Sequence, residues 1–285
     1  MDIAVLSDIH GNYAALQTCV DYALKRNIDT FLFLGDYLGE LAYPQKTMDI
    51  IWNMNAQYHC YFVKGNKEDY WLNYRRSGES GWKENDSTTG SLLYTYRHLS
   101  ERDMDFFSGL LCAQEIKLKD LPQMTLCHGS PDKVNEKMLP DQERTFEIME
   151  QNKSAYILCG HTHIQGKIQH KNRFVFNPGS VGVPFQSNGK TQFLILHGEE
   201  HRWKEEFISL AYDVHKVIDE LYESGLNFMA PCWCRVSEHL LLTGKISHGS
   251  VLARAMDLCR KDTGNCSWPD IPERYWEQAV AEMIL

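Results

Sequence analysis

Short hydrophobic runs in the first part of the chain end repeatedly in polar side chains. Each run has four to six residues rich in Val, Ile, Leu, Phe and Tyr, which is typical of a buried strand. With their polar endings they read IAVLSDIH, TFLFLGD, CYFVKGN, MTLCHG and YILCGHTH. The sequence therefore predicts buried strands whose ends carry Asp, Asn or His.

The segments between the first three runs have the spacing of helices. Residues 13–26 and 44–55 carry hydrophobic side chains at intervals of three and four. Strands alternating with helices favour a parallel sheet covered by helices. Because ligands bind at the carboxyl ends of the strands in such sheets, we expect the polar endings to gather on one rim.

The rest of the chain changes character twice. Residues 68–111 are polar and helical, with a Gly- and Ser-containing break, and we predict an insertion over the rim. Residues 166–180 and 191–210 alternate between hydrophobic and polar positions, which predicts antiparallel hairpins and a second sheet. Residues 227–285 are expected to form an appended helical element without recognisable chemistry.

Composition narrows the class of protein. The 38 acidic and 29 basic residues give a formal charge of -9, which argues against non-specific binding to nucleic acid or to an anionic membrane. No stretch approaches the roughly 18 apolar residues of a membrane span. The amino-terminal run has no basic leader or small-residue cleavage site, so we expect a cytoplasmic protein.

The nine cysteines are scattered, and several end apolar runs, which favours buried reduced thiols over a disulfide framework. The spacing of one group leaves a structural zinc site open as a minor alternative, although it differs from the usual two-residue knuckles. That group is Cys232, Cys234, Cys259 and Cys266.

Candidate metal ligands appear first in the Asp8-Ile9-His10 segment. In an extended backbone alternate side chains share a face, so both side chains can reach one ion. Taken alone, the segment favours a helix start capped by Asp8 or Asn12 over a metal site. Asp36 after a glycine and His128 at a strand end are also weak signals in isolation.

The pair His161 and His163 is more informative. Two imidazoles two residues apart after an apolar run need partners for their ring nitrogens, and a metal is the commonest partner. The full candidate set is Asp8, His10, Asp36, Asn66, His128, His161 and His163. Such a mixed oxygen and nitrogen set exceeds one tetrahedral ion and suits two divalent ions about 3.5 to 4 Å apart.

These motifs, in this order, resemble those of the calcineurin-like metallophosphoesterase family over about residues 1–200. The resemblance implies an α/β fold, a four-layer α/β/β/α sandwich of two mixed sheets with helices outside. It also implies a metallophosphoesterase domain over residues 1–225, with a helical C-terminal extension over 226–285. By the same similarity, one ion would be held by Asp8, His10, Asp36 and His163. The second would be held by Asp36, Asn66, His128 and His161, with Asp36 bridging.

The segment from Asn177 to Pro184 also looks like one found in the bacterial phosphodiesterase branch, which includes diadenosine tetraphosphate hydrolase-like proteins. There it backs the site, so Asn177 and Ser180 are expected to donate hydrogen bonds behind the ligands. A plain Pro-Gly turn is an equally good interpretation of these residues.

The function implied is a phosphoesterase with two divalent ions, Mn, Fe, Zn or Co with Mn favoured. It would hydrolyse phosphodiester or phosphoanhydride bonds through a metal-bridging hydroxide. Asn66, Lys67 and His128 are the expected catalytic residues. The expected partner is a small phosphoester or nucleotide such as a diadenosine polyphosphate, without stable nucleic-acid or membrane binding. A Ser/Thr-type protein phosphatase and a catalytically silent interaction module are the alternatives, and the oligomeric state stays open.

One motif departs from the family. Lys67 stands where the family usually has a histidine after Gly-Asn, and a lysine is a poor acid at neutral pH. Lys67 would then stabilise transition-state charge, or point into solvent while Glu68 or Asp69 organises the site. Alternatively the leaving group needs no acid, which would favour phosphoanhydrides and activated diesters over alkyl monoesters.

Overall fold

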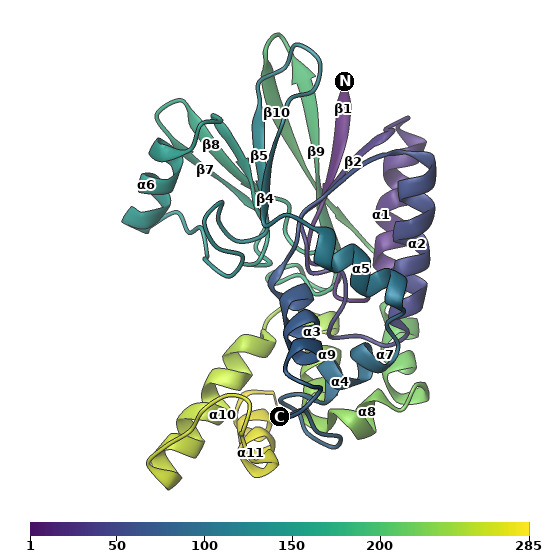
Figure 1. The fold of residues 1–285 in the computed structure, drawn as a ribbon, viewed down its shortest axis with the longest axis vertical. Helices are drawn as coiled ribbons and strands as arrows, with labels where there is room; N and C mark the ends of the chain where they lie inside the picture. Colours follow the sequence, from purple (N-terminus) through teal and green to yellow (C-terminus); the bar gives the residue numbers. More distant parts are fainter. Residues whose placement is uncertain (285) are drawn as a thin grey trace.

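The computed structural model describes residues 1–284, whose strands form two sheets of five strands each (Figure 1). The first sheet has the order β10-β9-β1-β2-β3, with β1 Asp2–Leu6, β2 Thr30–Phe33, β3 His59–Phe62, β9 Thr191–Glu199 and β10 Arg202–Leu210. The second has the order β4-β5-β6-β8-β7, with β4 Ala113–Ile116, β5 Met124–Cys127, β6 Tyr156–Leu158, β7 Gly166–His170 and β8 Arg173–Asn177. In the first sheet the parallel pairs β1–β2 and β2–β3 lie on one side and the antiparallel pairs β9–β1 and β10–β9 on the other. In the second sheet the parallel pairs lie between two antiparallel pairs, so the predicted pair of mixed sheets is confirmed.

The layers follow from the alternation of side chains along each strand. In β1, Ala4 and Leu6 pack in the core that contains residues of helices α1 (Tyr13–Lys25) and α2 (Pro44–Gln57). Ile3 and Val5 point the other way and pack with Leu126 of the second sheet. Helix α6 (Glu143–Gln151) covers the outer face of the second sheet, which completes four layers (Figure 1).

The two predicted hairpins both form, but they belong to different sheets. The hairpin β7–β8 joins the second sheet as expected. The hairpin β9–β10 instead pairs with β1 in the first sheet, so its assignment to a second sheet was wrong. Period-two alternation identifies a hairpin but does not name the neighbouring strand. The residues from Phe193 to Leu196 are buried on both faces, which suits a place inside the sandwich beside β1.

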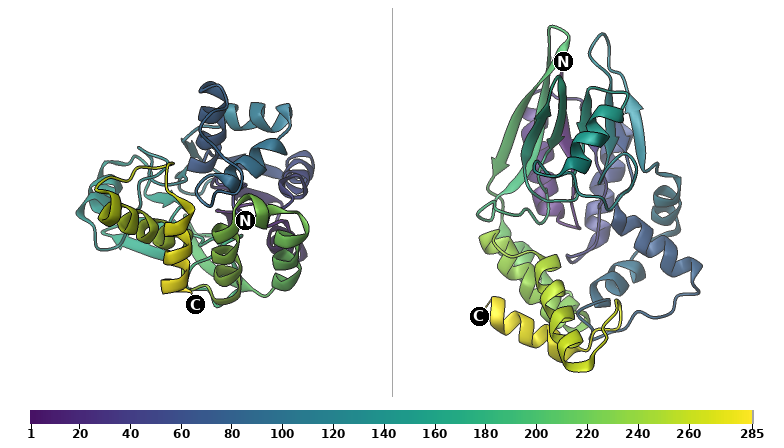
Figure 2. Two further views of the ribbon diagram at one scale, coloured as in Figure 1. Left: turned by 90° about the horizontal axis from the view of Figure 1, so that it is seen from below. Right: turned by 90° about the vertical axis from the view of Figure 1, so that its left-hand side faces the viewer.

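The other helices lie beneath the sheets, on the side where β1 ends (Figure 2). The segment predicted as an insertion carries α3 (Asn66–Arg76), α4 (Gly90–Arg97) and α5 (Glu101–Gly109). The end of the described chain carries α7 (Val214–Glu223), α8 (Leu226–Met229), α9 (Pro231–Thr243), α10 (His248–Thr263) and α11 (Glu273–Met283). None of the helices within residues 1–284 has the length and apolar character to cross a membrane.

Hydrogen bonds join the helices of the insertion to the C-terminal helices. The indole Nε1 of Trp276 donates to Thr88 at 2.8 Å, and the amide of Asp86 donates to the carbonyl of Met229 at 3.0 Å. Helices α9, α10 and α11 also share a core around Trp276. The C-terminal helices therefore have a fixed position against the insertion, while a domain boundary after residue 225 stays a prediction.

Candidate metal centre

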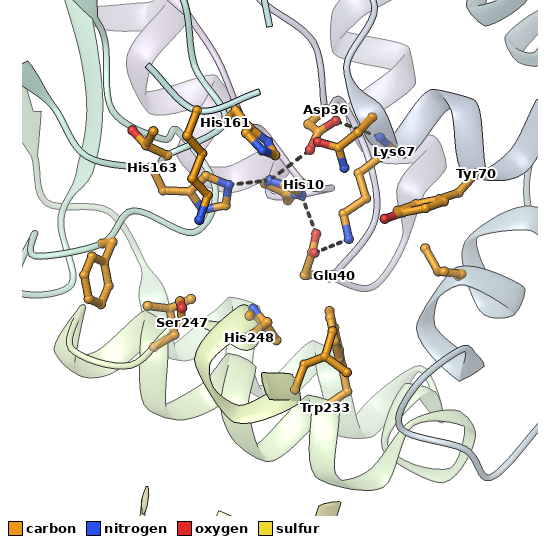
Figure 3. A pocket seen from close by; sticks show the side chains of 18 of the residues that line it. His10, Asp36, Glu40, Lys67, Tyr70, His161, His163, Trp233, Ser247 and His248 are labelled. Carbon is orange, nitrogen blue, oxygen red and sulfur yellow. Dashed lines mark hydrogen bonds and ion pairs between the residues drawn. The ribbon is translucent and has the colours of Figure 1, made fainter. Parts of the chain in front are cut away.

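The predicted ligands lie near one another where β1, β2, β3, β5 and β6 end. Figure 3 labels His10, Asp36, His161 and His163 among them. Asp8 and His128 are 0% exposed, His10 is 1% exposed and Asp36 is 2% exposed. The loops of both sheets contribute, so the rim predicted for one parallel sheet is built from two. Residues 155 positions apart along the chain thus share one small volume.

The first cluster joins Asp8, His10 and His163, whose ligand atoms all lie within 4.8 Å of one another. The Nε2 atoms of His10 and His163 are 3.1 Å apart. Asp8 Oδ1 lies 3.2 Å from His163 Nε2 and 3.7 Å from His10 Nε2. Asp8 Oδ2 is turned away and accepts hydrogen bonds from Ser7 Oγ and the His161 amide.

The second cluster joins Asp8, Asp36 and His128. Asp36 Oδ2 lies 3.4 Å from His128 Nε2 and 3.7 Å from His10 Nε2, so this one oxygen faces both clusters. Asn66, the first residue of α3, places its Oδ1 3.2 Å from His128 Nε2. The ring of His161 is 5.2 Å from that of His128 and lines the adjoining cavity, outside both tight clusters.

The chemistry of the donor atoms fits divalent cations. His163 Nδ1 faces the Val183 carbonyl at 3.1 Å and His128 Nδ1 faces the Leu34 carbonyl at 2.8 Å, so each ring donates there and turns a bare Nε2 inward. The inward atoms are then imidazole lone pairs and carboxylate oxygens, which repel one another unless positive charge lies among them. Asp8 Oδ1 is buried and accepts no hydrogen bond from residues 1–284.

The ligand-bearing loops hold unusual backbone conformations. Positive φ angles of 52° to 66° occur at Asp8, His10, Asp36, His161 and His163. Left-handed backbone at non-glycine residues is strained, and such strain concentrates at functional sites.

Close approach of the loops explains two of the motif glycines. A Cβ on Gly65 would lie 2.2 Å from Asp36 Oδ1, and a Cβ on Gly160 would lie 1.9 Å from Ser7 Oγ. Both glycines therefore let neighbouring loops touch.

Three further side chains fix these loops. Asn177 Nδ2 donates to the Gly160 carbonyl at 2.8 Å, and Ser180 Oγ donates to the Asp8 carbonyl at 2.7 Å, which places both as supports behind the ligands. The carboxylate of Glu68 accepts from the backbone amides of Asp36, Tyr37 and Gly65. Glu68 thus organises the loop that carries Asp36, while Asp69 pairs with Lys64 instead.

Glu40 is a functional candidate that the sequence did not reveal. Its carboxylate is 3% exposed, contacts His10 Nδ1 and lies 2.6 Å from Lys67 Nζ (Figure 3). The side chain of Lys67 is 11% exposed and lines the cavity, so the interpretation that it points into solvent is wrong. The only signal for Glu40 in the sequence is an acidic residue four positions after Asp36. Its local pattern does not distinguish it from a surface glutamate.

Burial and the neighbouring carboxylates act on the pKa values of the buried bases in opposite directions, and the carboxylates prevail. Burial lowers the pKa of His10, but the charges of Glu40 and Asp8 outweigh it and raise that pKa to about 10. Burial lowers the pKa of His128 too, and Asp36 and Asp8 raise it to about 9. Burial lowers the pKa of Lys67, and Glu40 and Asp36 more than restore it, so Lys67 stays charged. Without metal, protons therefore supply the positive charge that the carboxylates require.

A cavity of about 370 Å³ opens onto the ligands. Its far side includes Trp233 and His248 of the C-terminal helices (Figure 3). Trp268, in the loop between α10 and α11, also lines the cavity. The C-terminal helices therefore contribute side chains to the cavity beside the candidate ligands. Amphipathic spacing shows that a helix has a buried face, but not which surface that face covers.

Arg75, Arg97 and Trp82 of the insertion do not line the cavity. Arg75 pairs with Glu101 at 2.8 Å and Arg97 pairs with Glu84 at 2.5 Å, both on the surface. The ring of Trp82 stacks on Tyr74. Tyr70, Thr88 and Leu92 are the insertion residues that line the cavity.

Comparisons with known proteins show what the chain is similar to. Residues 1–201 match the family described as the calcineurin-like phosphoesterase superfamily domain. The uncharacterized protein MJ0912 of Methanocaldococcus jannaschii is 27% identical over 79% of this chain and 93% of its own length.

Two solved structures show the same fold. The hypothetical protein PH1004 from Pyrococcus horikoshii OT3 has a TM-score of 0.73 at 21% identity, covering 86% of this chain and 99% of that one. A metallophosphoesterase from Sphaerobacter thermophilus has a TM-score of 0.68 at 19% identity, covering 86% of this chain and all of that one. At these identities the likeness establishes the shared fold.

Proposed function

Because the chain belongs to the calcineurin-like phosphoesterase superfamily, we propose that it is a hydrolase of phosphodiester or phosphoanhydride bonds that uses two divalent ions. The observation that carries the proposal is the convergence of inward-facing atoms. His10 and His163 Nε2 are 3.1 Å apart, beside Asp8 Oδ1, which accepts no hydrogen bond within the described part of the chain. Such a set of buried lone pairs is suited to cations and to little else.

Each cluster would hold one ion. Asp8, His10 and His163 supply the first, and Asn66, His128 and His161 supply the second. Asp36 joins both, because its Oδ2 faces His10 and His128 at similar distances. Two such ions, when bound, acidify water and stabilise charge that develops on phosphoryl oxygens. The mixed ligand set is compatible with Mn, Fe, Zn or Co, and we favour Mn.

The protein's own residues would orient the substrate. Lys67 presents an ammonium group to the cavity and is fixed there by Glu40 at 2.6 Å, so it can attract a phosphoryl oxygen. Because its pKa is raised above the ordinary value, it is a poor proton donor to a leaving group. Leaving groups that are already weak bases fit best, which points to phosphoanhydrides such as diadenosine polyphosphates or to activated diesters.

The cavity argues against a protein phosphatase, and the ligand set argues against a catalytically silent interaction module. A volume of about 370 Å³ suits a small molecule. Helices α9 and α10 contribute part of the lining, which restricts the approach of a phosphorylated side chain on a folded protein. A silent interaction module would be expected to lack ligands, yet all seven positions are filled by metal-binding side chains.

Hydrolysis assays with Mn-loaded protein test the proposal. We expect turnover of bis-p-nitrophenyl phosphate and of diadenosine tetraphosphate, with p-nitrophenyl phosphate slower and EDTA abolishing all three. Asp36→Asn should lower kcat about 100-fold or more, because it weakens both ion sites, whereas the exposed Asp141→Asn should retain activity. An inert Mn-loaded protein, or an active Asp36→Asn variant, would contradict the proposal.

A further inference from the structure

The mouth of the cavity carries exposed aromatic side chains. Tyr70 of α3 is 36% exposed and Trp268, in the loop between α10 and α11, is 42% exposed. Their rings lie 5.7 Å apart with an interplanar angle of 26°, and both line the cavity. Large apolar groups left exposed together beside a polar site mark a place where a ligand binds.

A second aromatic pair lies deeper. The ring of Trp233 in α9 stacks on that of His248 in α10, with centroids 4.3 Å apart and planes 25° apart. Ser237 Oγ donates to the Trp233 carbonyl, so it accepts from His248 Nε2 at 2.8 Å. His248 Nδ1 then carries a lone pair that accepts no hydrogen bond from residues 1–284, and the ring lines the cavity (Figure 3).

Lys67 connects these aromatic rings to the metal centre. Its Nζ lies 5.5 Å from the ring centroid of Trp233 and 5.9 Å from that of Tyr70. The same Nζ is 2.6 Å from Glu40, which contacts His10. A phosphoryl group beside Lys67 would therefore have an aromatic wall within reach of its ester substituent.

We propose that this wall, formed by Tyr70, Trp233, His248 and Trp268, is a binding subsite for the base of a nucleotide. The inference rests on the proposed function, which places the phosphoryl group at the metal centre. A nucleobase has the two features that the wall matches: a planar π face for stacking on Trp268, and N–H donors for His248 Nδ1. An alkyl ester offers neither, and a sugar offers no π face.

Binding measured without metal tests the subsite separately from catalysis. Isothermal titration of the full chain in EDTA compares AMP with ribose 5-phosphate, which differ only in the base. We expect AMP to bind about tenfold more tightly, within the range of base stacking on aromatic side chains. Trp268→Ala and, independently, Tyr70→Ala should bring the ratio towards one. Phe228→Ala removes a 74% exposed aromatic side chain away from the cavity and should leave the ratio unchanged. Equal affinities in the unaltered chain would overturn the inference.

A kinetic comparison separates this inference from the proposed function. With Mn²⁺, the p-nitrophenyl ester of thymidine 5′-phosphate and methyl p-nitrophenyl phosphate share a leaving group and differ in the other ester. We expect kcat/KM to be about tenfold higher for the nucleotide ester. Hydrolysis of both at equal kcat/KM would refute the subsite and leave the hydrolase standing. Base-selective binding that depends on Trp268, without hydrolysis of either ester, would refute the hydrolase and leave the subsite standing.

Discussion

Replacing Glu40 by glutamine tests how the metal centre is held together. The Glu40 carboxylate contacts His10 Nδ1 on one side and Lys67 Nζ, at 2.6 Å, on the other. Glutamine has nearly the same volume but no charge, so it cannot neutralise Lys67 or hold the His10 ring as firmly. Groups that orient a metal-ligating histidine typically contribute about 10- to 100-fold in metal affinity. We expect a loss of that size for Mn²⁺.

The variant should also unfold more easily. Breaking a fully buried ion pair costs roughly 3 to 5 kcal/mol, but the Lys67 side chain is 11% exposed at the cavity and can recruit water. We therefore expect the free energy of unfolding in EDTA to fall by about 2 kcal/mol. Competition with a chelating dye gives the Mn²⁺ affinity, and urea unfolding gives the stability.

Glu220→Gln provides a matched control for this variant. Glu220 is 7% exposed and pairs with Lys46 at 2.8 Å, outside the cavity lining. Its replacement should lower stability and leave Mn²⁺ affinity unchanged. If Glu40→Gln binds Mn²⁺ within about twofold of the unaltered protein, Glu40 does not orient His10 and this part of the account is wrong.

Four further predictions concern the same centre. Gly65→Ala should abolish Mn²⁺ binding in equilibrium dialysis, because the added Cβ would lie 2.2 Å from Asp36 Oδ1, and retained binding would contradict this packing. Lys67→Met should lower kcat about 100-fold while two Mn²⁺ per chain remain bound by elemental analysis, and an unchanged kcat would remove the role of its charge. Mn²⁺ affinity should rise with pH up to about 9, since bound protons must leave His10 and His128, whose pKa values are raised to about 10 and about 9. In EDTA-treated protein both histidines have folded-state pKa values above the ordinary 6.5. Their contribution to the free energy of unfolding should therefore be fully present below pH 6.5 and should be lost as the pH rises through 9 to 10. A melting temperature and an affinity that are both independent of pH would refute these assignments.

The candidate ligands could be named from the sequence because their signals are local. Asp8 and Asp36 each follow an apolar run, and strand ends of an α/β sheet meet at one edge. The family pattern then fixed which of the twelve histidines belong together. The alternative interpretation as a helix cap holds for Asn12, whose side chain accepts a hydrogen bond from the Ala15 amide at the start of α1. Asp8 instead lies in both candidate metal clusters.

Tertiary packing decided what the sequence could not. Glu40 has no periodic pattern around it, and its importance arises only because the loop after β2 folds back onto His10 and Lys67. The spacing of residues in the C-terminal helices predicts apolar faces. Trp233 and His248 line the cavity only because of where α9 and α10 lie. The hairpin β9–β10 likewise joined the first sheet because burial on both faces, rather than alternation, determined its place.

A crystal structure of the Mn-loaded protein, with anomalous scattering measured at the manganese edge, would test the two-ion centre directly. We expect two peaks about 3.5 to 4 Å apart, with Asp36 bound to both. His10 and His163 should ligate one ion, and Asn66 and His128 the other. A single peak, a peak away from these side chains, or none at all would contradict it.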